Sequence, residues 1–255
     1  MKRLIALLAL TLAVAALPLL AQSKGTARLG AHFASDLQTI PVMGNTPGVN
    51  GSTFQTFVAL LNPTAASFPV EVTLYDGSGT KHTATITLAA GELKTYDNFL
   101  DAVFHVTGGG AVTLRAAESI GGTHNNRFIV DAEVHTTGTR YGTTIPALEF
   151  AGTSSRSLAA GISVNSTWRT NVGCFNQSDV ANNIKATVYD ASGTQALGSV
   201  NLNLAGNAWG QTAIPTIVSN GYIQFDPPEA AVCYAVVVDN TTNDGRFITA
   251  AEYRP

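Results

Sequence analysis

The chain is short of charged residues, histidine and cysteine, and each shortage argues against a class of protein. Charged residues make up 12% of the 255 residues, which is about half the usual share. The formal net charge is −3, or −5 without Lys2 and Arg3. No basic surface is therefore expected for nucleic acid or anionic lipid, and we predict no nucleic-acid partner.

Recognisable catalytic motifs are also missing from the sequence. The five histidines and two cysteines form no HExxH or CxxC pattern, and neither a GxSxG motif nor a P-loop occurs. These motifs place a metal, a nucleophile or a phosphate against fixed partners, and nothing here replaces them. We therefore expect no enzyme, with no catalytic residues, no cofactor and no metal ligands.

Long apolar runs are absent except at the amino terminus. There Lys2 and Arg3 precede an almost wholly apolar run at residues 4–20, and small residues follow at 21–23. This order is typical of a secretory signal peptide, which we place at residues 1–22. An uncleaved membrane anchor is the alternative. No later run approaches the ~20 apolar residues of a membrane span, so we expect a protein that is secreted or on the cell surface, with the periplasm as another option.

An internal repeat is the most informative feature of the sequence. Residues 52–80 match residues 166–194 at a constant offset of 114, without a gap, and 11 of the 29 positions are identical. The shared residues include Asn62 with Asn176, and Asp76 with Asp190. Fixed-period similarity indicates a duplicated structural unit. It also argues against a single jelly roll spanning both copies.

Each copy shows the alternation of β-strands. In residues 70–75 and 184–189, apolar residues alternate with polar ones, and turn-forming residues follow. Further strands are expected at 54–61, 83–88, 111–116, 127–134 and 141–145, and in the second copy at 170–175, 199–204, 222–225, 232–239 and 246–252. About seven short strands per ~100 residues predict an immunoglobulin-like or fibronectin-like antiparallel β-sandwich. The predicted fold is all-β, with tandem modules at 28–148 and 153–255.

The two cysteines are expected to form a disulfide. Cys174 lies in an early predicted strand of the second copy, and Cys233 lies in a late one. An immunoglobulin-type sandwich brings such strands together across its core, so we expect an inter-sheet bond. Two buried free thiols are the alternative.

One acidic and histidine-containing segment is a candidate metal or hydrolytic site. Asp97, Asp101 and His105 are spaced four residues apart and would share one face of a helix. The alternative is a solvated face of a short helix that covers the end of the sandwich, with Asp97 as its N-cap.

Other polar and aromatic residues of the second copy are candidates for a ligand surface. Trp168 and Trp209, together with Tyr75 and Tyr189, are candidates for a sugar-binding face, or simply for packing. Arg169 and Asp239 lie in neighbouring predicted strands and are candidates for a structural clamp or for ligand contact. Residues 239–245 have the composition of a calcium loop, but they lack its spacing and fit a hairpin turn better.

Several segments resemble a known but uncharacterised family. The segments are 47–56, 62–63, 141–147, 169–176 and 238–244. They are similar to a tandem β-sandwich module found in secreted bacterial proteins, alone or appended to exported enzymes. The resemblance implies a bacterial source, and it supplies no catalytic residues.

The function expected from these observations is structural or adhesive. We predict a non-enzymatic extracellular protein that interacts with a protein or a cell-surface polysaccharide. The alternatives are a carbohydrate-binding module that uses Trp168 or Trp209, and a secreted hydrolase or metal-binding protein that uses Asp97, Asp101 and His105.

Overall fold

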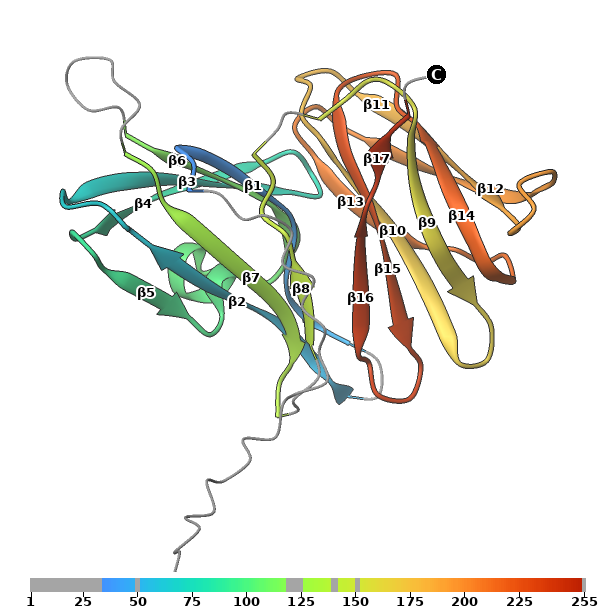
Figure 1. The fold of residues 1–255 in the computed structure, drawn as a ribbon, viewed down its shortest axis with the longest axis horizontal. Helices are drawn as coiled ribbons and strands as arrows, with labels where there is room; N and C mark the ends of the chain where they lie inside the picture. The colour runs from blue at the N-terminus through green and yellow to red at the C-terminus, as the bar shows by residue number, and fades with distance from the viewer. Residues whose placement is uncertain (1–33, 49–50, 118–125, 139–141, 150–151, 254–255) are drawn as a thin grey trace, which may run out of the picture.

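The computed structural model describes residues 34–48, 51–117, 126–138, 142–149 and 152–253, and it is built almost entirely of antiparallel strands (Figure 1). The all-β prediction is confirmed. The strands form three sheets, of eight, four and five strands. The predicted signal peptide, residues 1–22, lies outside the described residues.

The eight-stranded sheet contains every strand up to residue 145, and we call this part of the chain the N half. Its order is β4-β3-β6-β1-β2-β7-β8. Strand β5 also pairs with β2, on the edge opposite β7. A short π-helical turn, η2 (Leu100–Phe104), links β5 to β6. The strands are β1 (Leu37–Pro47), β2 (Thr53–Leu61), β3 (Phe68–Asp76), β4 (Lys81–Leu88), β5 (Leu93–Tyr96), β6 (Gly108–Ala116), β7 (Ile129–Thr136) and β8 (Gly142–Ile145).

The remaining strands form two sheets, and we call this part the C half. One sheet has the order β13-β10-β15-β16, and the other has the order β12-β11-β14-β9-β17. The strands are β9 (Ser157–Val164), β10 (Trp168–Asn176), β11 (Asn182–Tyr189), β12 (Ala196–Leu204), β13 (Trp209–Ala213), β14 (Val218–Asp226), β15 (Ala231–Asp239), β16 (Gly245–Thr249) and β17 (Ala251–Glu252).

The two halves have the same strand pairing. Advancing each label by eight converts β4-β3-β6-β1 into β12-β11-β14-β9, and β5-β2-β7-β8 into β13-β10-β15-β16. The isolated bridges match as well. The bridge between Ser35 and Phe128 in the N half corresponds to the bridge between Thr153 and Ala231 in the C half. The sequence repeat is therefore a repeat of structure, consistent with β-sandwich modules. The predicted limits of 28–148 and 153–255 stay a prediction, as does the immunoglobulin-like topology.

A repeated buried asparagine helps to explain why these residues recur. The Asn62 amide donates to the carbonyl oxygens of Ala66 and Ala89, each at 2.8 Å. The Asn176 amide donates to Val180 and Ala205 at 2.8 and 2.7 Å. Both asparagines are fully buried. Each buried amide therefore has its N–H groups satisfied by loop carbonyls, and a buried polar group without such partners would destabilise the fold.

Strand β1 distinguishes the two halves. It pairs with β6 on both sides of a register shift between Ile40 and Met43, and its end also pairs with β2. Pro41 lies within this shift, where a missing N–H disrupts no regular ladder. The N half is therefore one continuous sheet folded over on itself, whereas the C half keeps two separate sheets.

Candidate functional site

One face of the sheet β13-β10-β15-β16 is covered by the N half. Tyr234 belongs to the same buried apolar cluster as the N-half core, and Trp209, Val236 and Phe247 pack against that cluster. The opposite face of this sheet carries the C-half core, including Cys174 and Ala235. Strand β15 is therefore buried on both faces at its centre, which accounts for its nearly continuous apolar sequence.

Matched positions in the N half carry charged residues instead. Cross-strand pairing places Tyr234 opposite Gly173 and Val236 opposite Asn171 in the C half. In the N half, Asp131 lies opposite Ala59 and Glu133 opposite Phe57, and both acids are exposed. The outer face of this sheet is thus apolar in the C half, where the N half covers it. In the N half the same positions are exposed and carry acidic residues.

Tyr234 is the central contact between the halves. Its side chain is fully buried, and its ring stacks on Phe247 with centroids 4.9 Å apart. The hydroxyl accepts a hydrogen bond from Trp209 Nε1 and donates to Gln211 Oε1, each at 3.0 Å. Burial raises the pKa of this phenol well above its usual range, so the hydroxyl stays protonated. Gly173 leaves the necessary space, because a Cβ there would collide with the Tyr234 hydroxyl.

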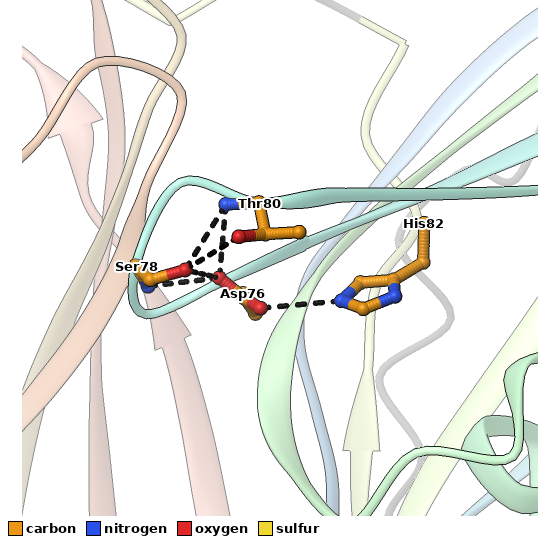
Figure 2. A network of polar contacts seen from close by, with 4 residues as sticks. All are labelled: Asp76, Ser78, Thr80 and His82. Carbon is orange, nitrogen blue, oxygen red and sulfur yellow. Dashed lines mark hydrogen bonds and ion pairs between the residues drawn. The ribbon is translucent and has the colours of Figure 1, made fainter.

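A second contact between the halves is the turn from β3 to β4, shown in Figure 2. Asp76 Oδ1 accepts hydrogen bonds from the Ser78 and Thr80 amides, at 2.8 and 3.0 Å, and Oδ2 lies 3.2 Å from His82 Nε2. Burial raises the pKa of Asp76, but the hydrogen bonds from Ser78, His82 and Thr80 together lower it below its usual value.

The ordered turn positions Gly79 against the C half. A Cβ at Gly79 would lie 2.6 Å from the carbonyl oxygen of Gly206. The C half repeats the turn, with Ser192 Oγ 2.7 Å from Asp190 Oδ1, but the strand register puts Gly198 at the position of His82. The Asp76 network is therefore a structural feature of the contact and not a separate site.

A cleft of about 300 Å³ lies where the two halves meet. The N half contributes inward-facing residues of its sandwich, among them Met43, Val134 and Ile145, and the C half contributes Trp209 and Val236. Its volume is at the lower end of the ~300–1,000 Å³ typical of small-molecule sites. Both halves therefore supply apolar residues to the cleft, together with neutral polar side chains such as Thr143 and Gln211.

Arg169 lies at this cleft and is the one charged side chain among the described residues that line it. Its Nη1 donates to the Asp239 carbonyl oxygen and to Asn240 Oδ1, both at 3.3 Å, and its Nη2 donates to Asn243 Oδ1 at 2.8 Å. Burial lowers the pKa of Arg169, and the nearby Asp239 charge opposes that effect. The guanidinium is held by neutral acceptors.

The predicted clamp between Arg169 and Asp239 is thus made through the Asp239 backbone and not through its carboxylate. The Asp239 carboxylate accepts the amide hydrogens of Thr241 and Thr242 at 2.7 and 2.9 Å. The Thr242 and Thr241 bonds lower the pKa of Asp239, with a smaller contribution from Arg169. Residues 240–244 join β15 to β16 as the expected hairpin.

The four aromatic candidates do not form one platform. Trp209 pairs with Phe175, so it is seven positions along β10 from Trp168, a separation on the order of 23 Å. Trp168 is 38% exposed, whereas the Trp209 ring lies close above Gly109 of the N half. Tyr75 contacts Phe175 across the halves, at 4.8 Å between centroids.

The fourth aromatic candidate lies on the other sheet of the C half. Tyr189 stacks on Tyr222 with centroids 4.9 Å apart. Since the Trp209 and Tyr75 rings pack between the halves and Tyr189 packs elsewhere, their observed contacts are structural. A ligand role for Trp168 or Trp209 stays a prediction.

The predicted helical face of Asp97, Asp101 and His105 is wrong. Strand β5 continues to Tyr96, and η2 begins only at Leu100 and ends where His105 adopts a left-handed conformation (φ 55°). The turn is too short for the three residues to share a face. Asn98 Oδ1 accepts the Asp101 amide hydrogen, a capping role predicted for Asp97. Among the described residues, no group of three His, Cys, Asp or Glu side chains is placed to hold a metal ion.

The predicted disulfide is confirmed, but its location differs from the prediction. Cys174 and Cys233 are bonded, and they are directly paired residues of the adjacent strands β10 and β15. The bond therefore joins two strands of one sheet, and the expected inter-sheet position is wrong. Both sulfurs are buried in the C-half core.

No known protein family and no curated protein matches this chain. The resemblance to a tandem module of secreted bacterial proteins thus stays a prediction, and what is established is an all-β chain with several antiparallel sheets. No helix among the described residues is long and apolar enough to cross a membrane.

Proposed function

We propose that the protein is a non-enzymatic extracellular interaction protein with a structural or adhesive role, secreted or held at the cell surface. The Cys174–Cys233 disulfide supports an oxidising compartment. The finer assignment to immunoglobulin-like or fibronectin-like modules of secreted bacterial proteins is part of the same proposal. It is supported by the repeated strand order of the two halves.

The observation that carries this proposal is a second copy of the face by which the C half contacts the N half, and among the described residues this copy stays exposed at Leu93, Asp131 and Glu133. We call the outer side of β5-β2-β7-β8 the open face, defined by Phe57, Ala59, Leu61, Leu93, Ile129, Asp131 and Glu133. Cross-strand pairing puts these residues on one side of the sheet. The matching face of the C half binds the N half. The open face is therefore the surface that this fold already uses to bind another module.

The chemistry of the open face indicates its partner. Leu93 is 62% exposed and lies beside Leu61, while the exposed Asp131 and Glu133 follow along β7. An exposed apolar patch bordered by charge marks a protein interaction site. Acidic residues attract a basic partner and disfavour others. The partner is accordingly a protein with an apolar centre and a basic rim.

Site-specific photocrosslinking tests the proposal. A benzophenone amino acid replaces Glu133 on the open face or, in the matched control, Glu71, which is exposed on β3. Each variant is secreted by its own host and irradiated there, and adducts are identified by mass spectrometry. The expected result is a discrete basic protein crosslinked from position 133, weakened by high salt, and absent from position 71. No adduct at 133, or the same adducts from both positions, would overturn the proposal.

A further inference from the structure

The cleft between the halves has the composition of a site for an amphiphilic anion. Its walls are mostly apolar, with Met43 and Val134 on one side and Trp209 and Val236 on the other. Neutral threonine, asparagine and glutamine side chains also line it, and Arg169 is the one charged residue among the described residues that do so. An isolated cation beside an apolar cavity attracts a ligand that has both an apolar body and a negative group.

The bonding of Arg169 leaves it able to accept such a ligand. A guanidinium has five N–H donors, and the three bonds to Asp239, Asn240 and Asn243 use three of them. All three acceptors are neutral oxygens, and the Asp239 carboxylate is bonded to the Thr241 and Thr242 amides. Two N–H donors therefore remain outside these three bonds, on a side chain that lines the cleft.

The location of Arg169 also sets it apart from its counterpart in the repeat. The matched residue of the N half is Gln55, which lies opposite His135 as Arg169 lies opposite Val238. Of these two matched positions, only the one in the C half carries a cation. Gln55 occupies the same position of the same strand pair without a charge, so the pairing of these strands does not by itself require an arginine.

We propose that the cleft binds a small carboxylate with an apolar body, whose carboxylate pairs with Arg169 while the body lies between Val134, Trp209 and Val236. The two free N–H donors of Arg169 bind the carboxylate oxygens, and burial strengthens that pair relative to an exposed one. This binding is separate from the open face and goes beyond the interaction role proposed above.

Titration of the intact, disulfide-bonded protein with octanoate and 1-octanol tests the proposal. The two probes share an apolar chain and differ in charge, and acetate supplies the charge without the chain. Calorimetry measures affinity, and Trp209 emission reports occupancy. We expect octanoate to bind at least about tenfold more tightly than octanol, and acetate to show no binding. Equal affinities for octanoate and octanol, or no octanoate binding, would overturn the proposal.

Matched variants separate the carboxylate contact from the shape of the cleft. Arg169→Gln, which installs the residue of the N half, should bring octanoate down to the affinity of octanol. Arg156→Gln removes an exposed arginine that pairs with Asp226 and should leave octanoate binding unchanged. Val236→Phe fills the cleft while leaving the Arg169 side chain in place and should abolish octanoate binding.

Two outcomes would count against the site. They are a charge preference that persists in Arg169→Gln, and full octanoate binding in Val236→Phe. Urea unfolding of each variant checks that the fold is intact. None of these results alters the crosslinking from position 133, so failure here and failure of the interaction role remain distinct.

Discussion

Exchanging matched residues between the two halves gives the sharpest test of how the halves pack. Tyr234→Asp puts the N-half residue Asp131 at the matched position in the C half. Tyr234 is fully buried, stacks on Phe247 and makes two hydrogen bonds. Loss of a buried aromatic side chain costs about 3–5 kcal/mol, and burial of a carboxyl adds about 1–3 kcal/mol. We expect a loss of about 4–8 kcal/mol, comparable to the whole stability of a small domain.

The reciprocal exchange provides the control. Asp131 is exposed, so Asp131→Tyr should change the unfolding free energy by no more than about 0.5 kcal/mol. Both variants are compared with the wild type by urea unfolding, followed by tryptophan fluorescence and far-ultraviolet circular dichroism. A cost below about 1 kcal/mol for Tyr234→Asp, or equal costs for the two exchanges, would refute the reasoning.

Three further predictions concern the repeated and the unique interactions. Asn62→Ala and Asn176→Ala should each cost about 2–3 kcal/mol in urea unfolding, because each removes two hydrogen bonds made by a fully buried amide; a loss confined to one half would contradict the equivalence of the two asparagines. Replacing both Cys174 and Cys233 by Ser should cost about 4 kcal/mol by the chain-entropy model, and the same loss on reducing the wild type checks it. Asp76 has a lowered pKa in the folded state, so its stabilisation should be present above the unfolded carboxyl value of about 3.9 and be lost as the pH falls through the folded value; unfolding midpoints across acidic pH should depend less on pH in Asp76→Asn.

Most of the fold could be predicted from the sequence, because the internal repeat and the alternation of apolar and polar residues identify most of the strands. The predicted strand at residues 54–61 is β2 (Thr53–Leu61), and the one at 111–116 lies within β6 (Gly108–Ala116). Strands β1 and β9 are missing from the prediction. Pro41 and Gly161 interrupt their patterns, and both residues lie at irregularities, Pro41 within a register shift and Gly161 at a φ of +83°. Proline and glycine are compatible with a strand at such places, although they obscure its alternation.

The short strands β5 and β13 are also missing, for a different reason. β5 has four residues and β13 has five, and each pairs along one edge only with the strand beside it. A strand this short, half exposed at an edge, has little alternation to detect. The prediction of a helical face at residues 97–105 was wrong for the same reason. Strand β5 is too short to be recognised, and it occupies the residues just before Asp97.

The cleft could not be predicted from the sequence, because it depends on which sheet faces of the two halves pack together. Val134 and Trp209 belong to different copies of the repeat, and neither sequence pattern says that they share a cavity. A signal was nevertheless present. At matched positions the first copy has Asp131 and Glu133, and the second has Tyr234 and Val236. A comparison of the copies by sheet face, and not only by identity, would have shown that the second copy is covered there.

The place of Tyr234 in the N-half core has a consequence for how the chain matures. The last N-half strand ends at Ile145, yet the side chain that completes its apolar cluster arrives almost ninety residues later. During synthesis or export in the amino-to-carboxyl direction, the first module would emerge before Tyr234 could cover its apolar cluster. The second module would then complete the folding of the first by covering these apolar residues. Proteolysis between Ile145 and β15 would therefore release a fragment prone to aggregation.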